Sequence, residues 1–288
     1  MKSKLAHIVI CLFLSTQALA QTQVEVITKT VKDQFVYQPG YGVEIEGKSA
    51  MISIQAWDKN EVGVEMKLIS KGLTRAIAEK ELKYQRYVID EINETYVIRN
   101  YLLLPNGLEK LSTIQETEIR LFLPRQVAVS VKNSFGNTSA KGLTGKLEIE
   151  SEYGDLSLQD LSGTLRIEST FGDLKIKNFT GSLTADLEHT ATEIAEYAGN
   201  AYIKTNLGDM RWSKIRELTR LRINAEKSDI SLDFLAPDPE AYYWSLRSKY
   251  GEIIFPGGTE EKNKITFGDD QNPPISITTD FGKITIEE

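Results

Sequence analysis

Hydrophobic and polar residues alternate in short runs along the middle of the chain. In the segment Ser151 to Glu168, Leu156 and Leu158 alternate with polar residues, and Leu165 and Ile167 repeat the pattern nine residues later. Alternation with a period of two places successive side chains on opposite faces of a strand. The pattern therefore predicts two short strands in this segment, each with one apolar face.

The same pattern recurs at a fixed spacing of 18 residues. Four copies cover residues 133–150, 151–168, 169–186 and 187–204. A fixed period of this kind is typical of stacked folds, in which each unit buries its apolar face against its neighbours. We predict an all-β fold, a β-solenoid of the parallel β-helix type over residues 131–288, with equivalent leucines stacked about 4.8 Å apart. An antiparallel meander with the same nine-residue half-period remains the alternative.

Each turn of the array carries a recurring signature of an aromatic residue, glycine and then aspartate or asparagine. The residue before the glycine is aromatic in most copies and is replaced in two others: Phe135, Tyr153, Phe171, His189, Leu207, Tyr250 and Phe281. Glycine permits tight backbone turns, and Asp or Asn side chains accept hydrogen bonds from turn N–H groups. We therefore interpret the signature as a turn device, and His189 as a turn residue.

The two flanks of the array differ from its interior. Residues 21–130 lack the period, and their alternating runs predict a β-rich N-terminal cap with one helix between Leu73 and Tyr84. A cap is needed because an open stack end would expose an unpaired sheet edge. Near the C-terminus we predict an insertion at 233–247 and an exposed polar loop at 256–278. The last strand is expected to close the C-terminal end.

The first 20 residues predict a signal peptide. Lys2 and Lys4 precede an apolar run, Ile8 to Leu14, that is too short to span a bilayer, and residues 18–20 form an A-x-A cleavage site. No later segment resembles a transmembrane helix. The sequence therefore predicts an exported protein that resides in the periplasm, at the outer-membrane surface or outside the cell.

The composition of the exported chain excludes several kinds of catalytic and binding site. Removing residues 1–20 takes away Cys11, His7, Lys2 and Lys4, which leaves no cysteine, a single histidine and a formal charge of −9 in place of −7. Disulfides, thiolate chemistry and multi-histidine metal sites are thereby excluded. The acidic balance argues against nucleic acid as a partner, since phosphate contacts need clustered Lys and Arg.

Two residue sets are candidates for binding. Glu150, Glu168 and Asp186 recur every 18 residues and would stack as a like-charged row that invites calcium, although a solvated acidic face explains the row equally simply. No other cofactor is indicated. The second set consists of aromatic residues expected to be exposed, where they would suit sugar rings or a protein partner: Tyr242, Tyr243, Trp244 and Trp212.

The repeat signature resembles that of a large bacterial family of secreted proteins described as putative adhesins of unknown function, DUF4097-like, with the motif S-x-[FY]-G-D-[IL]. SEYGDL and STFGDL, at Ser151 and Ser169, carry it, and RLFLP at Arg120 resembles the family's entry into the repeats. The resemblance covers nearly all of the exported chain. It implies a solenoid and an adhesin-like role, and it brings no catalytic residues with it.

Three functions follow from these observations. The first is a non-enzymatic envelope or surface protein that binds a glycan or another protein. The second is a carbohydrate-active enzyme that would use carboxylates of the repeats, which requires two or three of them in one groove. The third is a structural or regulatory component of the cell envelope, with a role in stress signalling. The absence of a catalytic constellation in the sequence favours the first.

Overall fold

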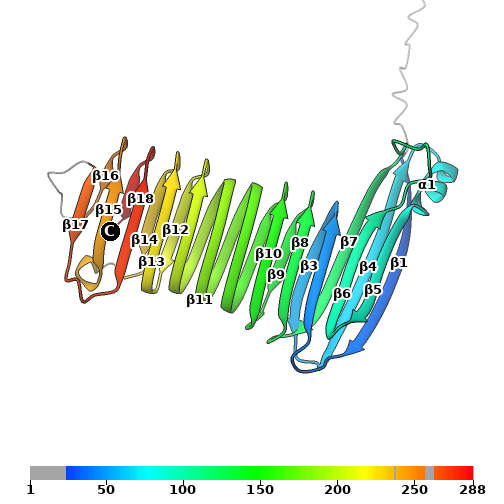
Figure 1. Ribbon diagram of the computed structural model, residues 1–288, viewed down its shortest axis with the longest axis horizontal. Helices are drawn as coiled ribbons and strands as arrows, with labels where there is room; N and C mark the ends of the chain where they lie inside the picture. The colour runs from blue at the N-terminus through cyan, green and yellow to red at the C-terminus, as the bar shows by residue number, and fades with distance from the viewer. Residues whose placement is uncertain (1–23, 237, 257–262, 288) are drawn as a thin grey trace, which may run out of the picture.

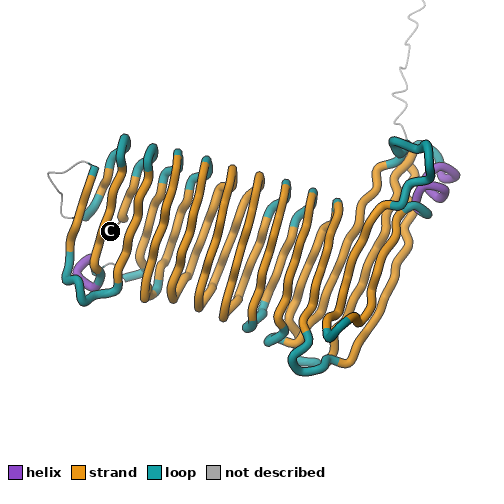
Figure 2. The backbone as a smooth tube through the Cα atoms, in the orientation of Figure 1, coloured by secondary structure: helices purple, strands orange, loops and turns teal. Residues whose placement is uncertain are grey.

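The computed structural model describes residues 24–236, 238–256 and 263–287, and the expected signal peptide lies outside them. The chain forms an elongated stack of flattened coils, with the N-terminal strands and a short helix at one end and the C-terminal strands at the other (Figure 1). Most coils contribute one strand to each of two sheet faces (Figure 2). The two faces enclose one continuous apolar core between them.

The strands of each face follow one another along the stack. The first face holds β5 (Gln85–Ile92), β6 (Thr95–Leu102), β2 (Gly42–Lys48), β8 (Ala128–Ser134), β10 (Lys146–Glu152), parts of the long β11 (Leu156–Asn206), β13 (Glu217–Glu226), β18 (Pro274–Thr279), β15 (Tyr243–Ser248) and β17 (Lys264–Phe267). The second holds β1 (Glu25–Val36), β4 (Glu61–Gly72), β7 (Ile114–Pro124), β3 (Ala50–Trp57), β9 (Thr138–Lys141), other parts of β11, β12 (Met210–Ile215), β14 (Ile230–Phe234), β19 (Ile284–Glu287) and β16 (Ile253–Ile254).

Pairing between successive coils is parallel and in register with the 18-residue period. Leu147 pairs with Leu165, and Ile149 pairs with Ile167. All four side chains are buried, so the predicted aliphatic ladders and the all-β solenoid are confirmed. The antiparallel meander is wrong, because antiparallel pairs in the described ranges occur only where β1, β4, β5 and β17 add to the ends of the stack.

Glycine is required where one coil presses on the next. A Cβ atom on Gly154 would lie 2.1 Å from the carbonyl oxygen of Gly136 in the preceding coil, far closer than non-bonded atoms approach. At the other turn of the coil, Gly163 has φ +102°, which L-residues rarely adopt. Coil-to-coil stacking therefore requires glycine at both edges, since a Cβ on Gly163 would lie 2.6 Å from the Gly145 carbonyl oxygen, and backbone conformation adds to this requirement at the second edge.

The order of coils in space differs from their order in the sequence at both ends. The coil of β6 and β7 lies outside the earlier coil of β2 and β3. Likewise the coil of β15 and β16 lies outside the later coil of β18 and β19. The last strand is therefore tucked inside the stack, and our expectation that it closes the C-terminal end is wrong.

Two expectations on the flanking segments also need correction. The segment 256–278, expected to be an exposed loop, contains β17 and most of β18, and its residues 257–262 lie outside the described part. The region 21–130 contributes two coils of the solenoid in addition to the cap, because parallel pairing starts at Gly42. Alternation was too weak in these segments to reveal long-range pairing.

The predicted helix is present as α1 (Arg75–Leu82), capped by the Thr74 side chain, which accepts a hydrogen bond from the Ile77 amide. Its packed face carries Ala78 and Glu81, which are buried, whereas Ile77 is exposed. The Glu81 carboxylate accepts hydrogen bonds from the amides of Ser112 and Thr113 and from the Thr113 hydroxyl, at 2.7–3.2 Å. Burial acts to raise the pKa of Glu81, but these hydrogen bonds outweigh it and the pKa is lowered.

Candidate functional site

The signature aromatics lie on one long edge of the stack, at the turns that lead from the first face to the second. We call this the aromatic edge; its defining residues are Phe135, Tyr153, Phe171, His189, Leu207, Phe281 and Tyr250. The first five have φ between +49° and +63°. This left-handed region is unusual for bulky residues. It turns each side chain outward, away from the core.

The rings of the aromatic edge are stacked face to face. Ring centroids are 5.1 Å apart from Phe135 to Tyr153, 5.0 Å from Tyr153 to Phe171 and 4.6 Å from Phe171 to His189, with interplanar angles of 2° to 10°. Each inner ring therefore has both faces covered by its neighbours. The rims of the rings face solvent, and Phe135, Tyr153 and Phe171 are 41–56% exposed.

Other exposed apolar residues gather at the same edge. Strand pairing places the ends of β6 and β4, the start of β7 and helix α1 at the N-terminal end of the aromatic edge. The exposed apolar residues there are Val24, Val26, Leu73, Ile77, Tyr101, Leu102, Leu103 and Ile114. At the opposite edge only Val36, Ile92, Leu235 and Phe267 are comparably exposed within the described residues. The aromatic edge is therefore the apolar side of the molecule.

Carboxylates line the aromatic edge, and several of them hold the turns together. Asp155 accepts a hydrogen bond from the Asp173 amide of the next coil at 3.1 Å, and Asp209 accepts one from the Asp229 amide at 3.0 Å. Asp229 in turn accepts one from the Lys283 amide. The interpretation of these aspartates as turn caps is therefore supported by geometry. Glu152 and Glu188 are exposed nearby.

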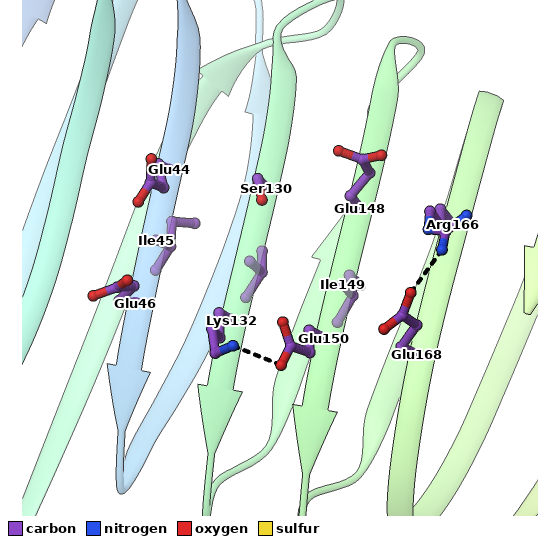
Figure 3. A pocket seen from close by; sticks show the side chains of 11 residues that line it. Glu44, Ile45, Glu46, Ser130, Lys132, Glu148, Ile149, Glu150, Arg166 and Glu168 are labelled. Atoms are coloured by element: carbon purple, nitrogen blue, oxygen red, sulfur yellow. Dashed lines mark hydrogen bonds and ion pairs between the residues drawn. The ribbon is translucent and has the colours of Figure 1, made fainter. Parts of the chain in front are cut away.

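The predicted acidic row lies on the outer surface of the first face. Glu150 and Glu168 are cross-strand neighbours, as the period requires. Figure 3 shows that each meets a cation: Lys132 Nζ lies 2.6 Å from Glu150, and an Arg166 guanidinium nitrogen lies 2.7 Å from Glu168. A shallow depression of about 300 Å³ runs between these side chains.

Asp186 continues the acidic row by one further repeat. Among the residues described by the structure, no group of three or more His, Cys, Asp or Glu side chains could hold a metal ion. Calcium at Glu150, Glu168 and Asp186 therefore stays a prediction, and ion pairing with Lys132 and Arg166 already offsets part of the charge that suggested it.

The four aromatic residues of the second candidate set are less exposed than expected. Trp212 and Trp244 are buried, with 0% and 1% exposure, so the expectation of two exposed indoles is wrong. Trp212 stands in register with Ile194 and Leu232 and therefore points into the core. Trp244 donates a hydrogen bond from Nε1 to the Pro239 carbonyl at 2.8 Å, which anchors the short 3-10 helix η1 (Pro239–Ala241).

The two tyrosines beside Trp244 are half-buried. Tyr242 packs against Phe234, and its hydroxyl accepts a hydrogen bond from the Leu218 amide at 3.4 Å. Tyr243 begins β15 in register with Pro274. The insertion thus closes the core at this end of the stack. Most of the exposed aromatic residues in the described part of the chain are those of the signature turns, which the sequence had indicated to be structural.

The sequence comparisons assign the chain to a family. The family model Toastrack DUF4097 matches residues 42–287. The chain belongs to this family. No curated protein matches it. Within the described residues, no helix is long and apolar enough to cross a membrane.

Several solved structures are similar to this one at low sequence identity. A putative adhesin from Bacteroides fragilis NCTC 9343 is 9% identical, with 90% of this chain and 97% of that chain covered and a TM-score of 0.40. A putative lipid binding protein from Parabacteroides distasonis ATCC 8503 is 12% identical over the same shares, with a TM-score of 0.44. A putative cell adhesion protein from Clostridium sporogenes ATCC 15579 is 12% identical, covered at 90% and 99%, with a TM-score of 0.24.

Proposed function

We propose that the protein is an exported, non-catalytic binding scaffold whose aromatic edge docks onto another protein. The observation that carries this proposal is the row of large apolar side chains held outward by left-handed backbone at successive coils. Asn, Asp or Gly would occupy these positions with less strain. Contiguous exposed apolar surface on a soluble fold is typical of an interaction site.

The stacking geometry favours a protein over a glycan as the partner. Sugar rings bind aromatic side chains by lying flat on a ring face. In the aromatic edge the faces of Tyr153 and Phe171 are covered by the neighbouring rings. What remains exposed is a ridge of ring rims, which fits an apolar groove of a protein surface.

The flanking charges further define the partner. Glu152, Glu188 and the turn aspartates line the ridge, and an anionic bilayer would bring further negative charge next to them. Desolvating these carboxylates without a counter-charge would be costly. A protein groove bordered by Lys or Arg would satisfy both the apolar ridge and its acidic margins. Export rests on the signal-peptide pattern of residues 1–20.

A binding assay with envelope fractions of the source bacterium tests the proposal. The wild-type chain should bind the envelope, and treating the envelope with protease beforehand should abolish the part of the binding that depends on the aromatic edge. The triple variant Phe135→Asn, Tyr153→Asn and Phe171→Asn should bind at least about tenfold more weakly, because hot-spot aromatics dominate interface energies. Asparagine is chosen because it tolerates the left-handed conformation.

The matched control replaces three exposed apolar residues of the opposite edge, Val36→Asn, Ile92→Asn and Leu235→Asn. This variant should bind like the wild type. Equal binding by the aromatic-edge variant would refute the proposal. Binding that is lost in the aromatic-edge variant, survives protease and is lost after periodate oxidation of the envelope would instead identify a glycan ligand of this edge.

A further inference from the structure

The outer surface of the first face changes its charge along the stack. Its N-terminal half carries the acidic row and paired cations described above. On the C-terminal half five cations project outward from β11, β13, β15 and β17. We call them the basic patch: Lys204, Arg220, Arg222, Arg247 and Lys264, all exposed.

The cations of the basic patch are free of ion pairs within the described chain. Earlier cations such as Lys132, Arg166 and Lys175 each meet a carboxylate. Beyond Glu193 the described residues hold one ion pair, between Lys227 and its neighbour Glu226. Other cations such as Arg211 and Lys214 also lack ion pairs within the described chain, but the basic patch gathers five of them on one face of a chain with an excess of acidic residues.

Strand register arranges the basic patch in a line. Lys204 pairs with Asn224, Asn224 with Thr278, Thr278 with Arg247, and Arg247 with Lys264. The row therefore runs across five strands, roughly 19 Å along the stack axis at the usual strand spacing. Lys204 lies at one end of this row and Arg247 and Lys264 lie at the other. The amide of Asn224 and the hydroxyl of Thr278 lie between them.

A second, parallel row supports the first. Tyr202 pairs with Arg222, whose guanidinium carbon lies 5.9 Å from the centre of the tyrosine ring. Arg222 pairs with Ser276, and Ser276 with Ser245. The second row therefore also places neutral hydrogen-bonding groups, the hydroxyls of Ser276 and Ser245, beside a cation, Arg222.

We infer that the basic patch binds a linear anionic polysaccharide that lies across the strands, along the stack axis. Lys and Arg would meet the carboxylate or sulfate groups. Asn224, Thr278, Ser276 and Ser245 would exchange hydrogen bonds with sugar hydroxyls. A flat, extended row suits a linear chain better than a compact anion. Four carboxylates, Asp186, Glu188, Glu226 and Asp280, line the same depression as Lys204, Asn224 and Thr278 and mark the border of the site toward the aromatic edge. The anionic groups would therefore lie over Arg222, Arg247 and Lys264, away from that border.

Binding of polygalacturonate, a carboxylated linear polysaccharide, to the purified chain tests the inference. Calorimetric titration at low and at physiological salt should show binding that weakens with salt, since exposed charges are screened. Neutral dextran should not bind. The double variant Arg222→Glu and Arg247→Glu should bind at least about tenfold more weakly, because each charge reversal replaces an attraction with a repulsion.

A charge-matched control separates the patch from net charge. Arg211→Glu and Lys214→Glu change two exposed cations of β12 on the second face, and this variant should bind like the wild type. Equal loss in both variants would overturn the inference, as would equal, patch-dependent binding of single-stranded DNA. No polygalacturonate binding, with a dimer in sedimentation that the Arg222 and Arg247 changes dissociate, would assign the patch to a second copy of the chain instead. None of these outcomes depends on the aromatic edge.

Discussion

The two long edges of the stack make similar turns but place different kinds of residue at the left-handed position. At the aromatic edge Tyr153 and Phe171 occupy the left-handed position and point into solvent. At the opposite edge Asp160 and Asn178 occupy the left-handed position, and the next residue points inward. Those inward residues, Leu143, Leu161, Phe179 and Tyr197, are buried.

The comparison shows that turn residues with positive φ direct their side chains toward solvent, whereas the buried turn residues that follow Asp160 and Asn178 lack positive φ. Asp and Asn are ordinary residues for the left-handed region, whereas Phe and Tyr are not. The left-handed residues of the opposite edge are polar, among them Asp160, Asn178, Glu196 and Lys214. The aromatic edge instead holds large apolar residues in this conformation at successive coils, and a repeated departure of this kind indicates a functional site.

The largest difference between the edges should appear when the same ring is removed from each. Phe179→Ala should lower the free energy of unfolding by about 3–5 kcal/mol, because a buried ring leaves a cavity. Phe171→Ala should cost no more than about 1.5 kcal/mol, the value of its stacking contacts. Urea unfolding of both variants measures the difference. Equal losses would show that the aromatic edge is a structural element.

Close stacking of coils at the aromatic edge can be tested through its glycines. Gly154→Ala should cost about 3 kcal/mol, because the new Cβ would press on the Gly136 carbonyl oxygen. Gly42→Ala is the control, since its Cβ would lie 3.6 Å from the nearest atom. That change should stay within about 0.5 kcal/mol in the same urea experiment. A neutral Gly154 variant would contradict the tight stacking.

The N-terminal end of the aromatic edge should depend on the Glu81 carboxylate. Glu81→Ala should cost about 2 kcal/mol, because it removes the hydrogen bonds that the amides of Ser112 and Thr113 donate to a charged carboxylate. The pKa of Glu81 is lowered from its ordinary 4.5 in the folded state. Its contribution is therefore present above pH 4.5 and lost as the pH falls through the lowered pKa.

Thermal unfolding at pH 7 and at pH 3 measures this dependence. The wild type should lose more stability on acidification than Glu81→Gln, which has no carboxylate to protonate. Equal acid sensitivity of the two proteins would show that other carboxylates govern acid stability.

The smallest effect on stability is expected where asparagine replaces a turn aromatic. Tyr153→Asn should stay within about 1 kcal/mol of the wild type, since asparagine relieves the left-handed strain while the stacking contacts are lost. Partner binding should nevertheless weaken. A calorimetric melt together with the envelope assay would separate the two effects, and a strongly destabilised variant would argue for a structural role.

Much of the architecture could be predicted from local pattern. The two-residue alternation around Leu156 and Leu165 and the 18-residue period indicated stacked parallel coils, and the helix near Arg75 was found where expected. The candidate site could not be placed in the same way. Trp212 was expected on the surface from the parity of its strand, and Trp244 because it lies in the predicted insertion at 233–247, but both side chains are buried in the core.

The sequence by itself determined the repeat, because apolar positions with an 18-residue period are buried when each unit of a stack covers the next. Strand pairing decided between parallel coils and an antiparallel meander of the same period. Only the tertiary structure decided which turn residues face solvent, because outward direction depends on backbone φ and not on residue type. It also decided the order of coils at both ends and gathered Arg222 and Arg247 on one face. These features depend on pairing between strands far apart in the chain, which local alternation does not encode.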